Sequence, residues 1–364
     1  MISVEDSKKV VLVALSHSSF TGGIQKYNRD LIESLSMSSH ISNVEVIDLY
    51  GYGSKNSYVK SFSGNKSLFT YKLVRSYLDA DILIWGHAVF LFFIPILSMF
   101  QWVGGRRKRT HILVIHGTDI TGRSMNVLSR QGLRACDAII SNSKSTANAL
   151  MTKYRFIDAK KIAVINPAIP KVDVPVVMEV ADRPSSQFKI LTVGRIEPSK
   201  LASIQRLIGA VGLMNGPSIS VEFNIVGSGS CMKELHELVA NLKIPHLKIN
   251  VHGYVEDLEK HYSASDLFFL VNKYEGFGIV YLEAMAHGVP CVAAKNSGAR
   301  EVIIHNETGF LIDNEDSELE IKKRLESFFS NDELRKRMKV NARRHVSRFN
   351  MDAFKTSVNK VLKL

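Results

Sequence analysis

Two glutamates, Glu275 and Glu283, lie eight residues apart on either side of a glycine-containing bend. The run before them, Asp266 to Val271, is short and apolar, as buried strands are. The run from about Gly278 to His287 has helical composition, and Gly288 to Pro290 ends it. In a strand–bend–helix segment, the first backbone N–H groups of the helix point outward, at the positive end of the helix dipole. Such a site suits a phosphate or another anion.

The two carboxylates are expected to flank that anion site. Glu275 would lie at the bend, and Glu283 about two turns into the helix. Carboxylate oxygens accept hydrogen bonds from hydroxyls, so the pattern suits a ligand with hydroxyls at both ends and phosphate between them. A nucleotide-sugar has that composition. A plain core helix with surface acids is the alternative interpretation.

Length and composition allow two globular domains of ordinary size. The chain has 364 residues and is 45% hydrophobic. Its 3 cysteines (Cys136, Cys231 and Cys291) are scattered. They favour neither a disulfide framework nor a zinc site, they fit a reducing compartment, and we expect them to be small buried side chains. The apolar run Val10–Leu15 is too short for a signal peptide, so we expect a first strand there.

The net charge is +12, from 47 lysines and arginines against 35 acidic residues. A basic protein attracts nucleic acid, anionic membrane or phosphorylated substrates. The sequence contains no helix-turn-helix, zinc-finger or RNA-binding aromatic pattern, so nucleic acid is not an expected partner.

Short apolar runs alternate with helical stretches and fall into two series. Apolar strands separated by helices predict parallel sheets covered on both faces, so two series predict two doubly wound α/β domains. The first series is Val10–Leu15, Val44–Leu49, Asp81–Trp85, His111–Ile115 and Ala138–Ser141. The second series is Ile190–Val193, Val221–Val226, Ile249–His252, Leu267–Val271 and Pro290–Ala293.

A proline-rich segment from Asn166 to Ser186 separates the two series. We therefore expect an N-terminal domain over residues 1–168, a linker over 169–186 and a C-terminal domain over 187–349. Ligands bind beyond the carboxyl ends of the strands in such sheets. The motifs that follow strands could thus converge in a cleft between the domains.

The segment from Glu275 to Glu283 resembles the E-x7-E motif of retaining glycosyltransferases with the GT-B fold, and most closely glycosyltransferase family 4. The following stretch, from Cys291 through Gly298-Ala299-Arg300-Glu301 to Leu311, is also similar to that family. The resemblance implies two Rossmann-like domains facing across a cleft. The acceptor would bind the first domain and the nucleotide-sugar the second. It also implies that a last helix within 350–364 packs back on the first domain.

In the N-terminal domain, the resemblance assigns roles to residues that follow strands. Gly22, on the acceptor side, and Gly23, at the donor diphosphate, would let the backbone approach a ligand closely. His116 would be exposed at a strand end, against the donor sugar near the reacting carbon, as a catalytic residue. Asp119 would orient His116 or order the acceptor site.

In the C-terminal domain, the resemblance assigns the donor diphosphate to Arg195 and Lys200. A planar guanidinium fork and a compact ammonium charge both suit phosphate oxygens. Leu201 stands where the family usually has a glycine after the lysine, which is a departure from the pattern.

The other donor contacts follow from the same resemblance. Glu275 would bind sugar hydroxyls as a catalytic residue, and Glu283 would accept hydrogen bonds from the ribose. Backbone N–H groups would bind the sugar or the diphosphate at Phe277, Gly278 and Ile279. The nucleotide pocket would be lined by Gly227, Tyr254 and Val255.

The segment Asp79-Ala80-Asp81 matches the metal-binding Asp-x-Asp of the other main glycosyltransferase fold. Here we expect it at a helix end that enters a buried strand, so no metal and no other cofactor is expected. Arg195, Lys200 and helix N-termini would meet the diphosphate charge instead.

The segment Val89–Val103 is very apolar, and the basic run Arg106–Arg109 follows it closely. It is shorter than the roughly 20 residues of a membrane span, and Pro95 interrupts it. A buried helix and an interfacial helix beside a polybasic patch are both open interpretations. The second predicts a cytoplasmic protein bound peripherally to the inner face of the membrane, with a lipid-linked acceptor.

The sequence thus predicts a retaining glycosyltransferase that moves a sugar from a UDP- or GDP-sugar to an acceptor hydroxyl. The acceptor would be a lipid-linked saccharide, and family habit implies a role in bacterial surface polysaccharide assembly, such as that of lipopolysaccharide. A GT-B relative acting as an epimerase or phosphorylase is one alternative, and a non-catalytic sugar-nucleotide-binding subunit is another. The presence of Arg195, Lys200, Glu275 and Glu283 argues against the non-catalytic alternative.

Overall fold

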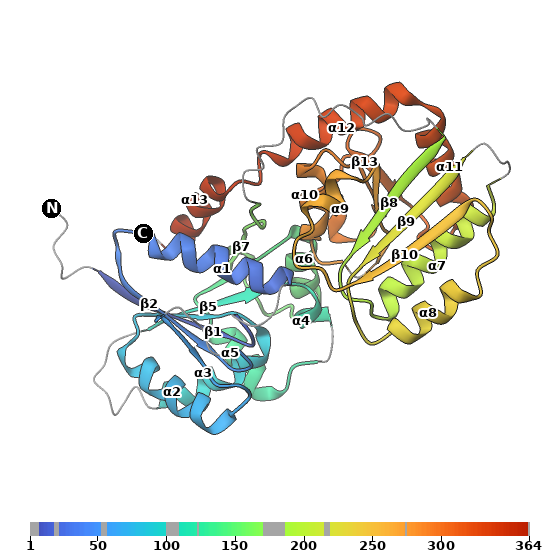
Figure 1. The fold of residues 1–364 in the computed structure, drawn as a ribbon. Coiled ribbons are helices and arrows are strands. Elements are labelled where there is room, and N and C mark those ends of the chain that lie inside the picture. The colour runs from blue at the N-terminus through green and yellow to red at the C-terminus, as the bar shows by residue number, and fades with distance from the viewer. Residues whose placement is uncertain are drawn as a thin grey trace. The chain divides into compact units, whose positions relative to one another are not determined.

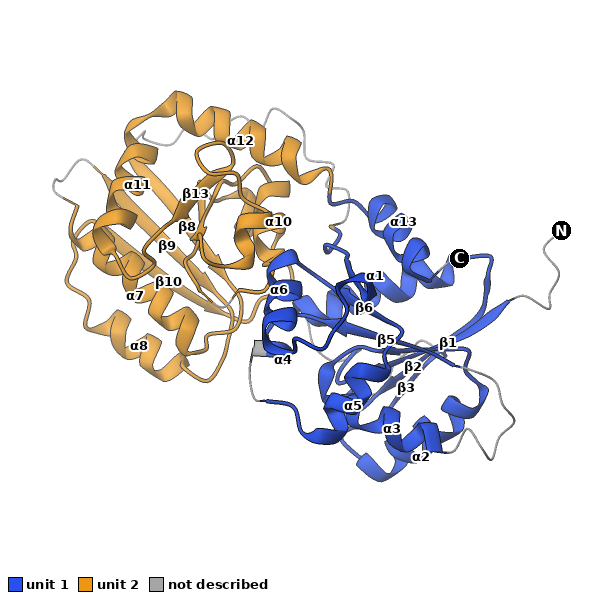
Figure 2. Ribbon diagram, turned by 180° about the vertical axis from the view of Figure 1, so that it is seen from behind, with its two compact units in different colours: residues 1–168, 349–364 blue, residues 169–348 orange. Residues whose placement is uncertain are grey.

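The computed structural model describes residues 7–17, 22–51, 57–99, 109–121, 124–169, 186–214, 219–273 and 275–362. The chain forms two compact units (Figure 2). Unit 1 comprises Met1–Ala168 and Phe349–Leu364, and unit 2 comprises Ile169–Arg348. Most of the predicted linker, residues 170–185, lies outside the described residues.

Unit 1 is built on a parallel sheet with the strand order β3-β2-β1-β4-β5-β6-β7. The order reverses between β1 and β4, which is where ligands bind in doubly wound sheets. The strands are β1 (Lys8–Ala14), β2 (Ile41–Asp48), β3 (Val59–Ser61), β4 (Ile82–Trp85), β5 (Thr110–Ile115), β6 (Ala138–Ser141) and β7 (Ile162–Val164).

Helices cover both faces of this sheet (Figure 1). Alternate residues of β1 belong to different cores, Val10 and Leu12 to one and Val11 and Val13 to the other. A strand buried on both faces is continuously apolar for this reason. The helical segments are α1 (Gly23–Ser36), α2 (Lys66–Asp79), η2 (Ala88–Phe92), α3 (Phe93–Met99), α4 (Thr118–Thr121), α5 (Val127–Ala135), α6 (Lys144–Lys153), η4 (Ala159–Lys161) and α13 (Met351–Leu362).

The last helix, α13, packs against α1 within unit 1. The Phe354 ring meets the Tyr27 ring edge-on, with 5.3 Å between centroids. The Tyr27 hydroxyl donates a hydrogen bond to the Ile165 carbonyl, and Lys26 Nζ donates one to the Ala168 carbonyl. Helix α1 thus contacts both the last helix, α13, and residues 165–168, which follow β7.

Unit 2 repeats the architecture, with the strand order β10-β9-β8-β11-β12-β13 and a reversal between β8 and β11. The two parallel sheets with helices confirm the predicted fold class. The strands are β8 (Gln187–Val193), β9 (Ser220–Val226), β10 (Leu247–Gly253), β11 (Leu267–Leu270), β12 (Cys291–Ala294) and β13 (Gly309–Ile312). The helical segments are α7 (Pro198–Gly212), α8 (Met232–Ala240), α9 (Glu259–Ser263), α10 (Ile279–Ala286), η5 (Gly298–Glu301), α11 (Glu318–Ser330) and α12 (Asp332–Val346).

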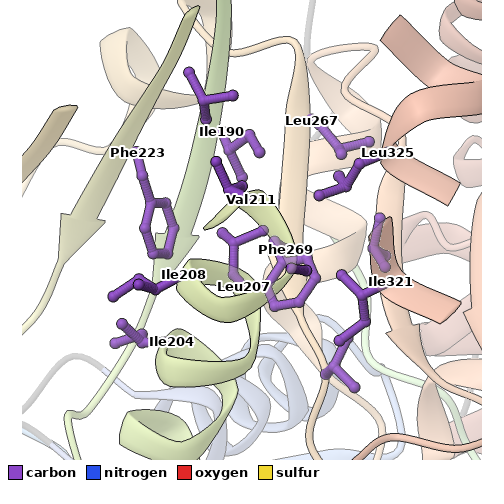
Figure 3. Close-up of a cluster of buried hydrophobic side chains, with 14 of the residues drawn as sticks. Ile190, Ile204, Leu207, Ile208, Val211, Phe223, Leu267, Phe269, Ile321 and Leu325 are labelled. Atoms are coloured by element: carbon purple, nitrogen blue, oxygen red, sulfur yellow. The ribbon is translucent and has the colours of Figure 1, made fainter. Parts of the chain in front are cut away.

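The core of unit 2 fixes α7 against the sheet (Figure 3). Ile204, Leu207, Ile208 and Val211 follow one another at helical spacing on the buried face of α7. They pack in one cluster with side chains of β8, β9, β11 and α11. Because this packing positions α7, it also positions the first turn of α7 at the carboxyl end of β8.

Two predictions concern residues directly before strands: Asp79–Asp81 before β4 and Arg109 before β5. Helix α2 ends at Asp79 and β4 begins at Ile82, with the Asp81 carboxylate accepting a hydrogen bond from the Lys9 amide at 2.8 Å. The Asp-x-Asp segment is therefore a helix end entering a buried strand, as predicted. Arg109, expected in a polybasic patch, is instead buried. Its guanidinium donates to the Tyr77 and Leu78 carbonyls at 2.7 and 2.9 Å, near the C-terminus of α2, so this part of the prediction is wrong.

The apolar segment 89–99 forms η2 and α3 and has two kinds of surface. Phe90, Leu91, Ile94 and Leu97 are buried in the core of unit 1. On the other side, solvent reaches Val89, Ile96 and Met99, which are 48%, 39% and 74% exposed. Residues 100–108, with most of the basic run, lie outside the described residues. Among the described helices, none has both the length and the apolar character needed to cross a membrane.

We predict that Phe354→Ala lowers the free energy of unfolding by about 3 kcal/mol, because truncating a buried phenyl ring leaves a cavity. Denaturant unfolding measures this. Lys360→Ala, on an exposed part of α13, is the control and should stay within about 0.5 kcal/mol of the original chain. Equal effects of the two changes would contradict the packing of α13 on α1.

Candidate active site

The two residues predicted to bind the diphosphate, Arg195 and Lys200, follow β8 and differ in burial. Arg195 is exposed, whereas Lys200, in the first turn of α7, is buried. Lys200 Nζ donates a hydrogen bond to the Val193 carbonyl at the end of β8. Burial lowers the pKa of Lys200 to about 8, and the negative charge of Glu275 acts in the opposite direction. Lys200 is thus buried at the carboxyl edge of the sheet, and Glu275 offsets only part of the cost of burying its charge.

Gly194 makes room for this lysine. Its φ of +132° lies where residues with a side chain are rarely found, and a Cβ there would come within 2.9 Å of Lys200 Nζ. Gly227, directly after the neighbouring strand β9, lies so close that a Cβ there would stand 1.9 Å from the Gly194 carbonyl oxygen. The Gly227 amide donates to the Gly253 carbonyl at 2.6 Å. The turns after β8, β9 and β10 therefore meet, and they bring predicted Gly227 near the turn that carries Tyr254 and Val255.

Helix α7 also holds the end of β11, just before Glu275. The Val271 amide donates to Ser203 Oγ at 2.9 Å, and Arg206 donates to the Val271 carbonyl at 3.3 Å. On the other side, the Gly298 amide donates to the Glu275 carbonyl at 2.9 Å. Ser203 is a residue that sequence reasoning missed, because a serine inside a helical pattern carries no local sign of this contact.

Glu275 and the start of α10 form the second half of the site. Burial raises the pKa of Glu275, while Lys200 and the Gly276 backbone lower it. Gly278 caps α10 with a φ of +84°, and a Cβ there would collide with the Tyr281 ring at 2.3 Å. The predicted backbone donors follow in order, with Phe277 buried and Ile279 opening the helix. Unit 2 thus brings Lys200 and Glu275 together beside a helix N-terminus.

Glu283 lies further along α10 and is half-buried. Its Oε2 accepts a hydrogen bond of 2.9 Å from the Tyr262 hydroxyl of α9. Tyr254, predicted to line the nucleotide pocket, is 60% exposed, and Val255 is half-buried. Sequence reasoning missed Tyr262, because the contact joins two elements that are separated by β11.

In unit 1, His116 follows β5 and is buried, so the expectation of an exposed imidazole at the strand end is wrong. The Tyr27 ring packs edge-on against it, with 5.4 Å between centroids, and covers part of it. Burial lowers the pKa of His116 to about 4, with Asp119 opposing and His87 adding to the shift. The imidazole is therefore neutral at pH 7. Its Nε2 has no hydrogen-bond partner within the described part of the chain.

Asp119 orders the backbone of this loop rather than the imidazole. Its Oδ1 accepts hydrogen bonds from the His116 and Gly117 amides at 3.0 and 2.9 Å. Gly22 and Gly23, the other predicted residues of this unit, are exposed at the start of α1. The predicted site residues thus fall into two groups, one in each unit, at the carboxyl edges of the two sheets.

Comparison with known proteins identifies the class. A family model described as "Glycosyl transferases group 1" matches residues 175–345, and one described as "Glycosyltransferase Family 4" matches residues 21–171. The chain belongs to the GT-B glycosyltransferases of the family 4 kind and is a transferase enzyme.

Individual relatives are distant. N-acetyl-alpha-D-glucosaminyl L-malate synthase of Bacillus anthracis is 28% identical over 58% of this chain, and the match spans 56% of that protein's length. An uncharacterized glycosyltransferase of Methanocaldococcus jannaschii is 22% identical over 96% of this chain and 97% of its own.

Two solved structures share the fold over nearly the whole chain. Anabaena HepE in complex with UDP-glucose has a TM-score of 0.74 at 20% identity, covering 98% of this chain and 99% of that chain. The lipopolysaccharide outer core galactosyltransferase WaaB has a TM-score of 0.74 at 18% identity, covering 98% and 100%.

We predict that UDP binding depends on the protonation of Lys200. A diphosphate binds the ammonium form better, so its charge should raise the lysine pKa from about 8 in the ligand-free unit. The dissociation constant should then increase as pH rises through about 8, by at most tenfold per pH unit, until the pKa of the bound state is passed. Calorimetric titration between about pH 7 and about pH 9.5 measures this.

Lys200→Gln is the control for this profile. The variant should bind UDP more weakly at the lower pH values and lose the decline in affinity that begins near pH 8. A wild-type affinity that stays constant or increases over the same interval would contradict the assignment.

Proposed function

We propose that the protein is a retaining glycosyltransferase that takes its sugar from a nucleoside diphosphate donor and transfers it to an acceptor hydroxyl. The observation that carries this proposal is the pairing of buried Lys200 with Glu275 at the N-terminus of α10. A cation and helix amides suit a diphosphate, and a carboxylate beside them suits the hydroxyls of the attached sugar. The HepE structures, which contain UDP and UDP-glucose, support a donor of this class.

In this proposal, the protein works by positioning and by charge stabilisation. Negative charge develops on the leaving diphosphate, and Lys200, Arg195 and the amides at the start of α10 would stabilise it. Glu275 would hold the sugar hydroxyls and so fix the anomeric carbon. No metal ion is required, because these protein groups meet the charge.

His116 would act as a hydrogen-bonding group rather than as an acid. A histidine with a pKa of about 4 is neutral at pH 7 and so has no imidazolium proton to give as a general acid. Its neutral ring can contact a sugar hydroxyl next to the reacting carbon. Retention of anomeric configuration would then follow from a front-face displacement, in which the leaving phosphate accepts the proton of the acceptor hydroxyl.

The acceptor is proposed to be a lipid-linked saccharide, met at the inner face of a membrane during surface polysaccharide assembly. Val89, Ile96 and Met99 of η2 and α3 present exposed apolar side chains. The chain's charge of +12 would add attraction to anionic lipid. The galactosyltransferase WaaB, a structural neighbour, is named for lipopolysaccharide outer core, which is consistent with this setting.

Glu275→Ala, His116→Ala and Lys200→Ala should each lower kcat by about 100-fold or more while the protein stays folded. Each change removes one group that holds the sugar or the leaving diphosphate. Glu333→Ala and Lys336→Ala, at exposed positions of α12, are matched controls and should transfer sugar normally. Transfer near the wild-type rate by two of the three site variants would overturn the site.

The same assay tests the reaction. UDP-, GDP- and ADP-sugars are first ranked by thermal stabilisation of the wild-type protein. The best donor is then incubated with a lipid-linked acceptor, and the anomeric configuration of the product is read by NMR. A product of inverted configuration would refute retention, and epimerised donor in the absence of acceptor would favour an epimerase.

We expect the protein to sediment with anionic vesicles more strongly than with neutral ones. The double variant Ile96→Glu/Met99→Glu should lose most of this binding, because it places two charges on the exposed apolar side of α3. Leu319→Glu, at an exposed leucine of unit 2, is the control and should sediment normally. Equal sedimentation of the wild-type protein with both vesicle types would reject membrane binding.

A further inference from the structure

Tyr262 of α9 contacts the side chain of Glu283, the second glutamate of the motif. Its hydroxyl lies 2.9 Å from Glu283 Oε2. An ionised carboxylate only accepts hydrogen bonds, so the phenol is the donor. Burial and the neighbouring Glu283 both raise the pKa of Tyr262 well above its ordinary value. The phenol therefore keeps its proton and donates a hydrogen bond to the carboxylate.

The ring of Tyr262 contacts two aromatic neighbours. It stacks on His287, with 5.4 Å between ring centroids and 19° between the planes. It also packs on Phe268 of β11, with 6.1 Å between centroids. The Tyr262 side chain is only 2% exposed. A ring in this position has little freedom, so its hydroxyl is a fixed point.

His287, which stacks on Tyr262, is itself held by hydrogen bonds. The ring of His287 contacts the Glu283 carbonyl through Nδ1 at 2.9 Å, and Arg343 of α12 donates to the His287 carbonyl at 3.2 Å. Helices α9, α10 and α12 thus fix the Tyr262 ring, and the ring fixes the Glu283 carboxylate. Ordering the Glu283 carboxylate before the ligand binds lowers the entropy cost of binding.

We propose that Tyr262 is a positioning residue that holds the Glu283 carboxylate in the orientation in which it binds the ribose of the donor. This inference rests on the proposed nucleoside diphosphate donor and deepens it. Tyr262 itself would not contact the nucleotide. It would strengthen the ribose contact by arranging the acceptor oxygens in advance, so its loss should affect ligands with ribose hydroxyls and spare ligands without them.

Calorimetric titration with UDP and with 2′,3′-dideoxy-UDP tests this. Wild-type protein should prefer UDP, because the dideoxy form lacks the hydroxyls that Glu283 binds. Tyr262→Phe should weaken UDP binding about tenfold, which is the order expected for one hydrogen bond to a charged group, and leave dideoxy-UDP binding within about twofold. In turnover, the donor KM should rise while kcat changes little, because ribose contacts are the same in the ground and transition states.

Two further variants separate positioning from general damage. Tyr281→Phe also removes a buried tyrosine hydroxyl, but the Tyr281 hydroxyl donates to the Leu270 carbonyl and not to Glu283. The Tyr281→Phe variant should therefore keep the wild-type ratio of UDP to dideoxy-UDP affinity. In the Glu283→Gln background, adding Tyr262→Phe should change that ratio no further, because the two residues act as one unit.

The outcomes distinguish this inference from the proposed function. If Glu283→Gln loses ribose preference but Tyr262→Phe keeps the full wild-type ratio, Tyr262 does not position the carboxylate. If the wild-type protein fails to bind UDP, or Glu283→Gln discriminates as the wild type does, the proposed donor site itself is wrong. If Tyr262→Phe does not fold, Tyr262→Met replaces it, with the same expected loss of ribose preference.

Discussion

The burial of Lys200 beside Glu275 is the interaction on which the arrangement of unit 2 depends. A charge taken out of water is costly unless it gains a partner and hydrogen bonds. Lys200 gains the Val193 carbonyl and the charge of Glu275, and neither compensates it fully, since its pKa falls to about 8. A cation that lacks full compensation favours the arrival of an anion. The burial that costs stability therefore also makes this position suited to an anion, such as the proposed diphosphate.

Several structural details follow from the need to place that lysine. Gly194 has to lack a side chain, because a Cβ would meet Lys200 Nζ. Helix α7 has to begin directly after β8, and its apolar face has to pack on the sheet to keep it there (Figure 3). Ser203, on the buried side of the same helix, then holds the end of β11, which sets the position of the loop with Glu275. One helix thus positions both members of the pair.

Unit 1 builds its group of candidate residues by a different route. Its histidine is neutral and buried, with the Tyr27 ring packed edge-on against it. Tyr27 in turn contacts Phe354 of α13, so the last helix of the chain supports the surroundings of His116. The two units share a sheet architecture, but one presents a buried lysine near a carboxyl group and the other an uncharged ring.

The sequence alone predicted the fold class and placed the candidate site residues in segments that follow strands. Apolar runs such as Leu267–Val271, glycine turns and the spacing of Glu275 and Glu283 are local patterns, and local patterns predict parallel strands and the loops at their ends. The short strands β3 and β7 were not predicted, because three residues are too few to show a pattern.

The tertiary structure alone decided what each side chain contacts. It turned Arg109 from an expected surface cation into a buried partner of the Tyr77 carbonyl, enclosed His116, and brought Tyr262 to Glu283 across β11. Such contacts join elements far apart in the sequence, and they depend on packing that no single segment specifies.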